Sequence, residues 1–254
     1  MPKQSHMTEQ IKILFLAANP TDRARLELDG EFRAIQDALL RGKYRGSFKL
    51  LLPRLAVRID DFTSALTREQ PHIIHFSGHG SVEQGIAFEG ADRASRPAGR
   101  EELTRLFKVL ARNVRLIFLN ACYTHEQAVA LGQMFDYTIG TNSRIMDADA
   151  CDFAGAFYRA LFDGATVPGA FLSAQSALDN RIRAISVLSQ RTTADNSIPF
   201  VSQVLSHARR QRNYGSVNMT IVKGKGKVDT IINAPRSNFT INSPPPKPRR
   251  KGRS

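Results

Sequence analysis

The sequence predicts an α/β fold in which a mostly parallel sheet of about six strands lies between two layers of helices. Two observations lead to this prediction. Short apolar runs alternate along the chain with longer segments of helical periodicity, which is typical of strand-helix-strand units. The first run, IKILFLAA at residues 11–18, is continuously apolar, as expected of a strand that helices bury on both faces.

The elements follow in order. After the strand at 11–18, the apolar residues of segment 25–40 recur at helical spacing, and segment 60–70 predicts a short helix with Asp60 or Asp61 as its cap. Later helices are predicted where a similar spacing recurs, at 101–113, 127–135, 151–164 and 169–188. Strands are predicted at apolar runs bounded by turn residues, namely 48–55, 72–79, 115–122 and 136–142, with a small hairpin arm at 85–90 and a sixth strand near 198–201.

The end of the chain has a different composition. From Arg209 to Ser254 there are twelve Lys or Arg residues and one acid, so nearly all of the net charge of +13 lies there. We expect a flexible segment 1–10, a main domain 11–208, short β-strands within 209–242 and disorder over 243–254, where proline and charge prevent packing. Any contact with nucleic acid is expected to be nonspecific, through residues 209–254 and counterion release.

Composition also limits the cellular setting and the chemistry. The sequence has no apolar run of membrane-spanning length and no apolar segment typical of a secretory signal near its start, so we expect a cytoplasmic protein without membrane contact. Its two cysteines, Cys122 and Cys151, are too few for a disulfide framework. No cluster has the spacing of metal ligands, and no cofactor is expected.

A histidine and a cysteine end two successive predicted strands. His79 follows the strand at 72–79 between two glycines, and Cys122 follows the strand at 115–122. If these strands are neighbours, the side chains lie within reach at the carboxyl edge of the sheet. Thr124 and Gln127 can form a capping box for the next helix, and a thiol at a helix amino terminus near an imidazole is suited to act as a nucleophilic thiolate.

Other candidates for chemistry are expected to be structural. His75 lies inside a predicted strand and is expected to be a hydrogen-bonded core residue. His125 should face solvent, and Cys151 should pack on a helix face with Ala154 and Tyr158. Taken singly, a histidine or cysteine ending an apolar strand is also more often structural than catalytic. The pairing of His79 with Cys122 is what favours catalysis.

Three motifs carry a family resemblance. Ser77-Gly78-His79-Gly80, Asn120-Ala121-Cys122 and IMDADACDFAGAFYRALFDG at 145–164 resemble signatures of the caspase-like cysteine proteases of clan CD, and most closely the CHAT domain, which is related to separase and the metacaspases. The likeness covers about residues 11–205. It implies a caspase-haemoglobinase-like three-layer sandwich.

The resemblance implies roles for named residues. Cys122 would be the nucleophile and His79 the proton shuttle, with the amides of Gly80 and Cys122 as the oxyanion hole. The loop before Ala150 would line the specificity pocket, where Asp147 aligns with an acid of this branch and Asp149 is a second candidate. Carboxylates there would select Arg or Lys by charge-assisted hydrogen bonds; the alternative is that one or both simply cap the helix predicted from 151. Metacaspases have an acid two residues before the cysteine, where this chain has Asn120.

The sequence therefore predicts a cysteine endopeptidase that acts on protein substrates and cleaves after Arg or Lys. By family resemblance, a partner or sensor protein would activate it in a bacterial defence or cell-death pathway. Two alternatives stay open: a catalytically silent adaptor with the caspase fold, and an α/β protein that binds nucleic acid through its basic tail. The intact pair of His79 and Cys122 argues against the adaptor.

Overall fold

The computed structural model describes residues 9–110, 113–178 and 186–215. The chain divides into two compact units, Met1–His207 and Ala208–Ser254. The first unit contains a six-stranded sheet with the strand order β2-β1-β3-β7-β8-β9, in which every neighbouring pair is parallel except β8 and β9. Its strands are β1 (Ile11–Ala17), β2 (Phe48–Leu50), β3 (Ile73–Ser77), β7 (Leu116–Asn120), β8 (Tyr137–Thr141) and β9 (Ser186–Gln190).

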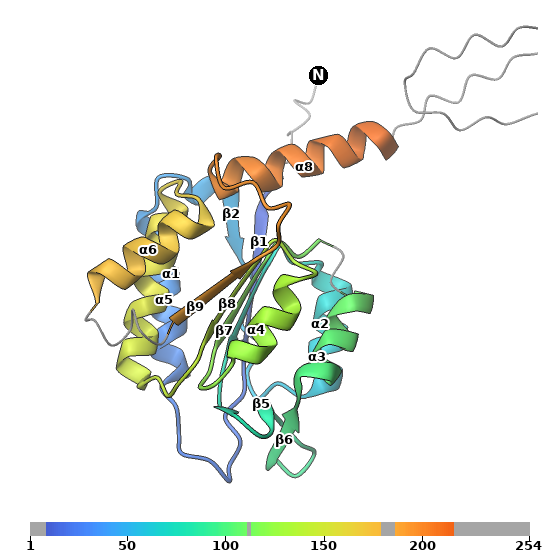
Figure 1. Ribbon diagram of the computed structural model, residues 1–254, viewed down its shortest axis with the longest axis vertical. Coiled ribbons are helices and arrows are strands. Elements are labelled where there is room, and N and C mark those ends of the chain that lie inside the picture. The colour runs from blue at the N-terminus through green and yellow to red at the C-terminus, as the bar shows by residue number, and fades with distance from the viewer. Residues whose placement is uncertain (1–8, 111–112, 179–185, 216–254) are drawn as a thin grey trace, which may run out of the picture. The chain divides into compact units, whose positions relative to one another are not determined.

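Helices cover both faces of this sheet (Figure 1). One layer consists of α1 (Leu28–Arg41), α5 (Asp147–Phe162) and α6 (Val167–Ala177). The other consists of α2 (Ile59–Glu69), α3 (Arg100–Leu110) and α4 (His125–Gly132). A small second sheet, β4 (Gly80–Ser81), β5 (Gly85–Glu89) and β6 (Ser95–Ala98), follows β3 directly. The predicted three-layer α/β fold and the hairpin arm are confirmed.

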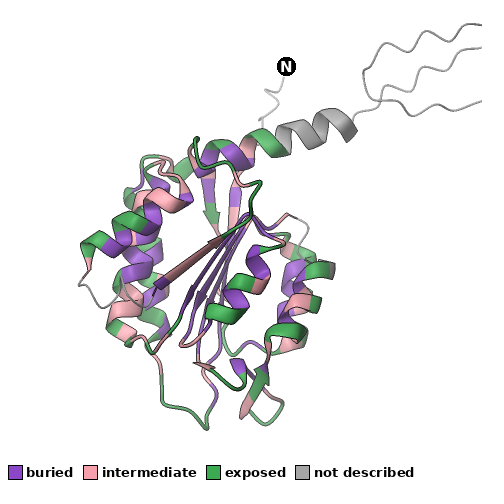
Figure 2. Cartoon of the chain, viewed as in Figure 1, coloured by how far each residue is buried: buried purple, intermediate pink, exposed green. Residues whose placement is uncertain are grey.

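Burial on both faces explains the continuous apolar strands. Along β1, Ile13 and Phe15 belong to the core on the α1 and α5 side, whereas Leu14 and Leu16 belong to the core on the α2 and α3 side. All of β1 except Lys12 is buried, as are β3, β7 and β8 throughout (Figure 2). Each large apolar side chain buried in this way stabilises the fold by about 1.5–3 kcal/mol.

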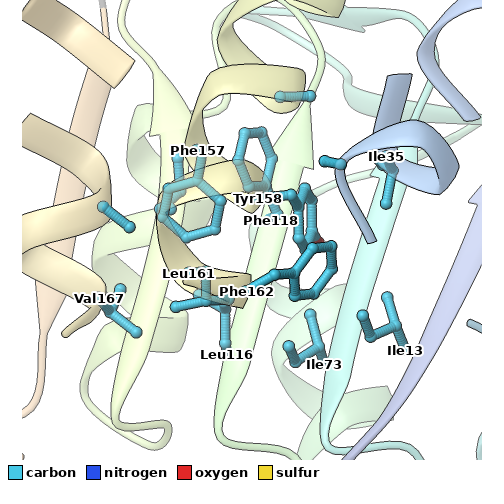
Figure 3. Close-up of a cluster of buried hydrophobic side chains, with 14 of the residues drawn as sticks. Ile13, Ile35, Ile73, Leu116, Phe118, Phe157, Tyr158, Leu161, Phe162 and Val167 are labelled. Carbon is cyan, nitrogen blue, oxygen red and sulfur yellow. The ribbon is translucent and has the colours of Figure 1, made fainter. Parts of the chain in front are cut away.

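Aromatic residues of α5 form the centre of the first core. Phe157, Tyr158 and Phe162 lie over the strands that carry Ile73 and Leu116 (Figure 3). They recur at helical spacing, so one face of α5 is apolar and packs on the sheet. This packing holds the start of α5 over the carboxyl ends of β3 and β7.

Two predictions near the end of the sheet are wrong. The sixth strand is β9 at 186–190. The segment predicted as that strand, 198–201, instead leads into α8 (Phe200–Gly215). The helix predicted over 169–188 ends as α6 at Ala177, and its last residues form β9. β9 is an edge strand with mostly half-exposed residues, so it lacks the apolar run by which buried strands are recognised.

Other boundaries shift for local reasons. The strand predicted over 48–55 pairs regularly only as β2 at 48–50, and Pro53, which has no N–H to donate, follows. The N-cap of α2 is Arg58, not Asp60 or Asp61. Asp61 lies in the first turn, where its carboxylate accepts a hydrogen bond from the backbone N of Arg58 at 3.3 Å. Residues 209–215 begin the segment predicted to hold short β-strands, but in the structure they continue helix α8. The predicted strands within 216–242 and the disorder of 243–254 lie outside the described residues.

The helices give no sign of a membrane span. Within the described segments, none is both long enough and apolar enough to cross a bilayer.

Candidate active site

His79 and Cys122 follow the ends of two neighbouring strands. β3 and β7 are neighbours, and Ser77 at the end of β3 is paired in register with Asn120 at the end of β7. His79 and Cys122 therefore lie the same distance, two residues, beyond a matched pair. The backbone N of Gly78 also donates to the Asn120 carbonyl at 3.2 Å, which extends the contact past the strand ends. The predicted adjacency of the strands is confirmed.

Gly80 lies directly against the backbone of Cys122. A Cβ atom placed on Gly80 would be 2.0 Å from the Cys122 carbonyl oxygen and 3.3 Å from the Cys122 nitrogen. Only a residue without a side chain permits this approach. The glycine after the histidine is thus required by close contact with the cysteine.

The Gly80 amide points away from the hairpin strand beside it. Ala87 N donates to the His79 carbonyl at 2.9 Å, which makes Gly80 and Ile86 a non-hydrogen-bonded pair of the antiparallel β4–β5 ladder. The Gly80 N–H is therefore not used in that ladder and is directed to the opposite edge. This orientation is compatible with its predicted role as an oxyanion donor.

A backbone carbonyl orients the His79 ring. Nε2 donates to the carbonyl oxygen of Ala24 at 2.8 Å, which leaves Nδ1 as the nitrogen that can accept a proton. Burial lowers the pKa of His79 below its ordinary value, although the bond to Ala24 and the carboxylate of Asp147 oppose this effect. At neutral pH the ring is mainly neutral and can act as a base.

Cys122 sits on a sharp turn between β7 and α4. Its Sγ lies 3.8 Å from the Ile145 carbonyl. The next residue, Tyr123, has a φ of 57°, a left-handed conformation that is costly for a bulky side chain. Its backbone N donates to the Ser143 carbonyl at 3.2 Å, which helps to hold the turn. Such strained turns are found at functional sites, where they present a side chain in one defined direction.

The capping box predicted for α4 is absent. Thr124 occupies the N-cap position, but its hydroxyl makes no cap hydrogen bond. The hydroxyl instead donates to the Ala121 carbonyl at 3.1 Å and accepts from Thr141 N at 2.9 Å. Thr124 thus joins the turn that carries Cys122 to the end of β8, a tertiary contact that outweighs the local motif.

A small pocket of about 40 Å³ is lined by His79, Cys122 and the start of α5. Asp147 is the first residue of α5, and its Oδ2 accepts from Glu27 N at 3.4 Å. Asp149, two residues further along α5, is half-buried and does not line the pocket. Because α5 starts at Asp147 rather than at 151, the predicted loop before Ala150 is the first turn of this helix. The pocket is lined by Leu26, Glu27, Leu28, Glu31, Ser77, Gly78, His79, Asn120, Ala121, Cys122, Ile145, Asp147, Ala150 and Cys151.

Cys151 lies in the wall of this pocket and does not simply pack in the core as predicted. Burial, reinforced by the nearby carboxylates of Glu31 and Asp147, raises the pKa of its thiol to about 12. The two cysteines of the pocket are therefore chemically distinct, because the thiol of Cys151 stays protonated at physiological pH.

Iodoacetamide at pH 8 is expected to modify Cys122 at least about tenfold faster than Cys151, because with a pKa of about 12 only about one Cys151 thiol in 10⁴ is ionised. Mass mapping of the two cysteine-containing peptides over time measures both rates. In 8 M urea the two rates should converge, which serves as the control. Equal rates in the folded protein would contradict this prediction.

The two histidines that were expected to be structural, His75 and His125, lie as predicted. His75 is fully buried and hydrogen-bonded to Glu31 and Tyr158, and His125 is exposed at the start of α4. Two participants were not identified from the sequence: the carbonyl of Ala24, which leaves no sequence signal, and Glu31, a buried carboxylate in the wall of the pocket. Glu31 lies on the buried face of α1, where the other residues are apolar. An acid on such a face is unusual, and this was the sequence signal that could have identified it.

The chain has relatives among known proteins. A probable protease of Gillisia limnaea is 27% identical over 154 residues, which are 60% of this chain and 27% of that protein. A Roc-COR-CHAT protease of an unknown prokaryotic organism is 27% identical over 184 residues, 70% of this chain and 17% of that protein. The chain therefore spans less than a third of the length of either relative.

The fold has a counterpart among solved structures. The Arg specific cysteine proteinase gingipain R superposes with a TM-score of 0.51 at 13% identity, covering 75% of this chain and 48% of that one. At this identity the likeness concerns the fold alone. The family model of the CHAT domain matches residues 2–184, a segment that includes β3 and β7, His79 and Cys122, and the start of α5. The chain belongs to the CHAT domain family.

Proposed function

We propose that the protein is a cysteine endopeptidase in which Cys122 and His79 form the catalytic dyad. The observation that carries this proposal is the placement of both residues two positions beyond the matched ends of β3 and β7, with the Gly80 backbone against that of Cys122. Two reacting side chains held at one edge by a rigid sheet need little reorganisation when a substrate binds.

The proposed chemistry gives each of these groups a role. Nδ1 of His79 takes the thiol proton of Cys122, and the thiolate attacks the carbonyl carbon of the scissile peptide bond. The carbonyl oxygen gains the negative charge and accepts hydrogen bonds from the amides of Gly80 and Cys122. His79 then gives its proton to the departing amine as the C–N bond breaks. Water, deprotonated by His79, hydrolyses the thioester and restores the thiol.

We assign the preference for Arg or Lys before the scissile bond to Asp147. It lines the pocket beside Cys122, and its carboxylate acts electrostatically on His79, so it faces the place where a substrate side chain would enter. A guanidinium or ammonium group can pair with it by a charge-assisted hydrogen bond. Asp149 does not line this pocket, which favours Asp147 as the residue that sets the preference.

Asp147→Ala is expected to lower kcat/KM for substrates with Arg or Lys before the scissile bond by about tenfold or more, and for apolar substrates much less. The lost contact is worth roughly 1.5–3 kcal/mol. The measurement compares two peptides that differ only at this position. Asp152→Ala, an exposed acid of the same helix, should leave both rates unchanged. An equal loss on both peptides would show that Asp147 only stabilises the start of α5.

We further propose that a partner or sensor protein controls the activity in the cytoplasm, within a defence or cell-death pathway. The support is that the matched segment is a minor part of each curated relative, so in those proteins the protease-like region is joined to much more chain. The basic segment 209–254 is the part of this chain that we expect to meet such a partner or nucleic acid.

Deleting residues 216–254 should then change the basal activity or its response to the activating signal. Unchanged activity and response would show that the segment has no regulatory role.

A peptide electrophile tests the central proposal most directly. An acyloxymethyl ketone on a short peptide ending in Arg should bond covalently to Cys122 in the native protein and not after denaturation. The same compound ending in Asp is the matched control for the pocket. Absence of labelling, together with absence of cleavage in a random peptide library, would point to a silent adaptor.

A further inference from the structure

A buried carboxylate lies beneath the dyad. Glu31 of α1 is only 3% exposed, and three side chains donate to it. His75 Nε2 donates to Oε1 at 2.6 Å, Asn120 Nδ2 donates to the same oxygen, and Ser77 Oγ donates to Oε2. A buried charge of this kind is costly unless it is fully hydrogen-bonded, and here three donors from two strands meet it.

Two of these donors occupy equivalent positions. Ser77 is two residues before His79, and Asn120 is two residues before Cys122. The two are also partners in the β3–β7 register. One carboxylate group therefore binds both strand ends at the points from which the two dyad segments depart.

The network is anchored on its other sides. The ring of His75 is stacked between Phe15 and Phe118, with ring centroids 5.1 and 4.7 Å away. Its Nδ1 lies 3.2 Å from the Tyr158 hydroxyl, which can donate to it when Nε2 donates to Glu31. Asn120 Nδ2 also donates to the Ala150 carbonyl of α5 at 3.2 Å. Two of the three donors to Glu31 are thus themselves held by further contacts.

We infer that Glu31 is a positioning residue that keeps His79 and Cys122 in register with each other. This inference rests on the proposed dyad and adds a residue that does not touch the reacting atoms. When the carboxylate is removed, Ser77 and Asn120 lose their common acceptor, and the two segments become free to move independently. Misplacement of catalytic groups by about 1 Å is enough to cost on the order of 100-fold in rate.

The first test does not depend on catalysis. In Glu31→Ala, amide hydrogen exchange of the segments 78–81 and 121–124 should become faster together, while exchange in β8 stays unchanged. Gln203→Ala is the matched control, because Gln203 is also buried and hydrogen-bonded, to Tyr137 at the amino end of β8 and to the Ile198 carbonyl. Faster exchange in all strands, or in one of the two segments alone, would overturn the inference.

The second test separates positioning from folding. Per folded molecule, Glu31→Ala should lower kcat by on the order of 100-fold with KM changed less than about threefold, whereas Gln203→Ala should keep kcat. Glu31→Gln should recover most of the rate, since its amide oxygen can still accept from His75 and Asn120 and its amide nitrogen can donate to Ser77 Oγ. A kcat in Glu31→Ala equal to that of Gln203→Ala would overturn the inference.

Two further comparisons apply if Glu31→Ala does not fold or if the wild-type protein is inactive. If Glu31→Ala does not fold, Ser77→Ala and Asn120→Ala replace it, and each should loosen its own segment and lower kcat by a smaller factor. Unchanged exchange and kcat in both would overturn the inference. If the wild-type protein cleaves no peptide, the proposed function fails, but the exchange comparison still decides whether Glu31 couples the two segments.

Discussion

Cys122→Ala and His79→Ala are each expected to abolish peptide cleavage, with a fall in kcat of at least about 10⁴-fold. The first removes the only atom that can bond to the substrate carbonyl in the proposed mechanism, and the second removes the base that accepts the thiol proton. Loss of a nucleophile or its base in a protease of this type has effects of about this size or larger. The loss is measured as the rate of cleavage of a peptide substrate that a library screen of the wild type has identified.

Both variants should remain folded. The two side chains are half-buried at the rim of the sheet and belong to neither hydrophobic core. His125→Ala, which changes an exposed histidine three residues beyond Cys122, is the matched control and should keep full activity. Cleavage by either dyad variant at a rate near that of the control would refute the assignment of the dyad.

Gly80→Ala is expected to lower kcat by on the order of 100-fold or more. The added Cβ would lie 2.0 Å from the Cys122 carbonyl oxygen, so the two backbones must separate by more than 1 Å to reach an ordinary contact. That movement displaces an oxyanion donor and the nucleophile at once. Steady-state kinetics and the rate of Cys122 alkylation both report on this movement.

Gly46→Ala is the control for this prediction, because nothing lies within 4 Å of the Cβ that it would add. It should leave activity unchanged. If Gly80→Ala cleaved peptides as fast as Gly46→Ala, the close contact of Gly80 with Cys122 would have no part in catalysis.

Agreement between the predicted and observed elements depends on burial. β1, β3, β7 and β8 were recognised because helices cover both of their faces, which demands continuous apolar runs. β9 was missed because an edge strand half-open to solvent has no such requirement, and its apolar residues continued the spacing of the preceding helix. The start of α5 was placed too late because Asp147 and Asp149, acids that favour the first turn of a helix, resemble loop residues in the sequence.

In the candidate site, too, local features could be predicted from the sequence and contacts with distant segments could not. His79, Gly80 and Cys122 could be identified because each follows a recognisable strand directly, and parallel neighbouring strands bring their carboxyl ends to one edge. Cys151 was assigned to core packing from its helix face alone, since sequence spacing does not show which loop that face meets. The capping box at Thr124 failed for the same reason, because Thr141 from β8 meets the hydroxyl instead.

The amino-acid sequence by itself determined the layered α/β fold and its buried strands, and it predicted His79 and Cys122 as a dyad, since these depend on local hydrophobic patterns and on motifs a few residues long. Only the tertiary structure decided that Ala24 orients His79, that Gly80 touches Cys122 and that Glu31 binds both strand ends. Each of these contacts joins residues more than 40 positions apart in the chain. A side chain or carbonyl acquires such a partner only when packing brings distant segments together, and no local pattern records it.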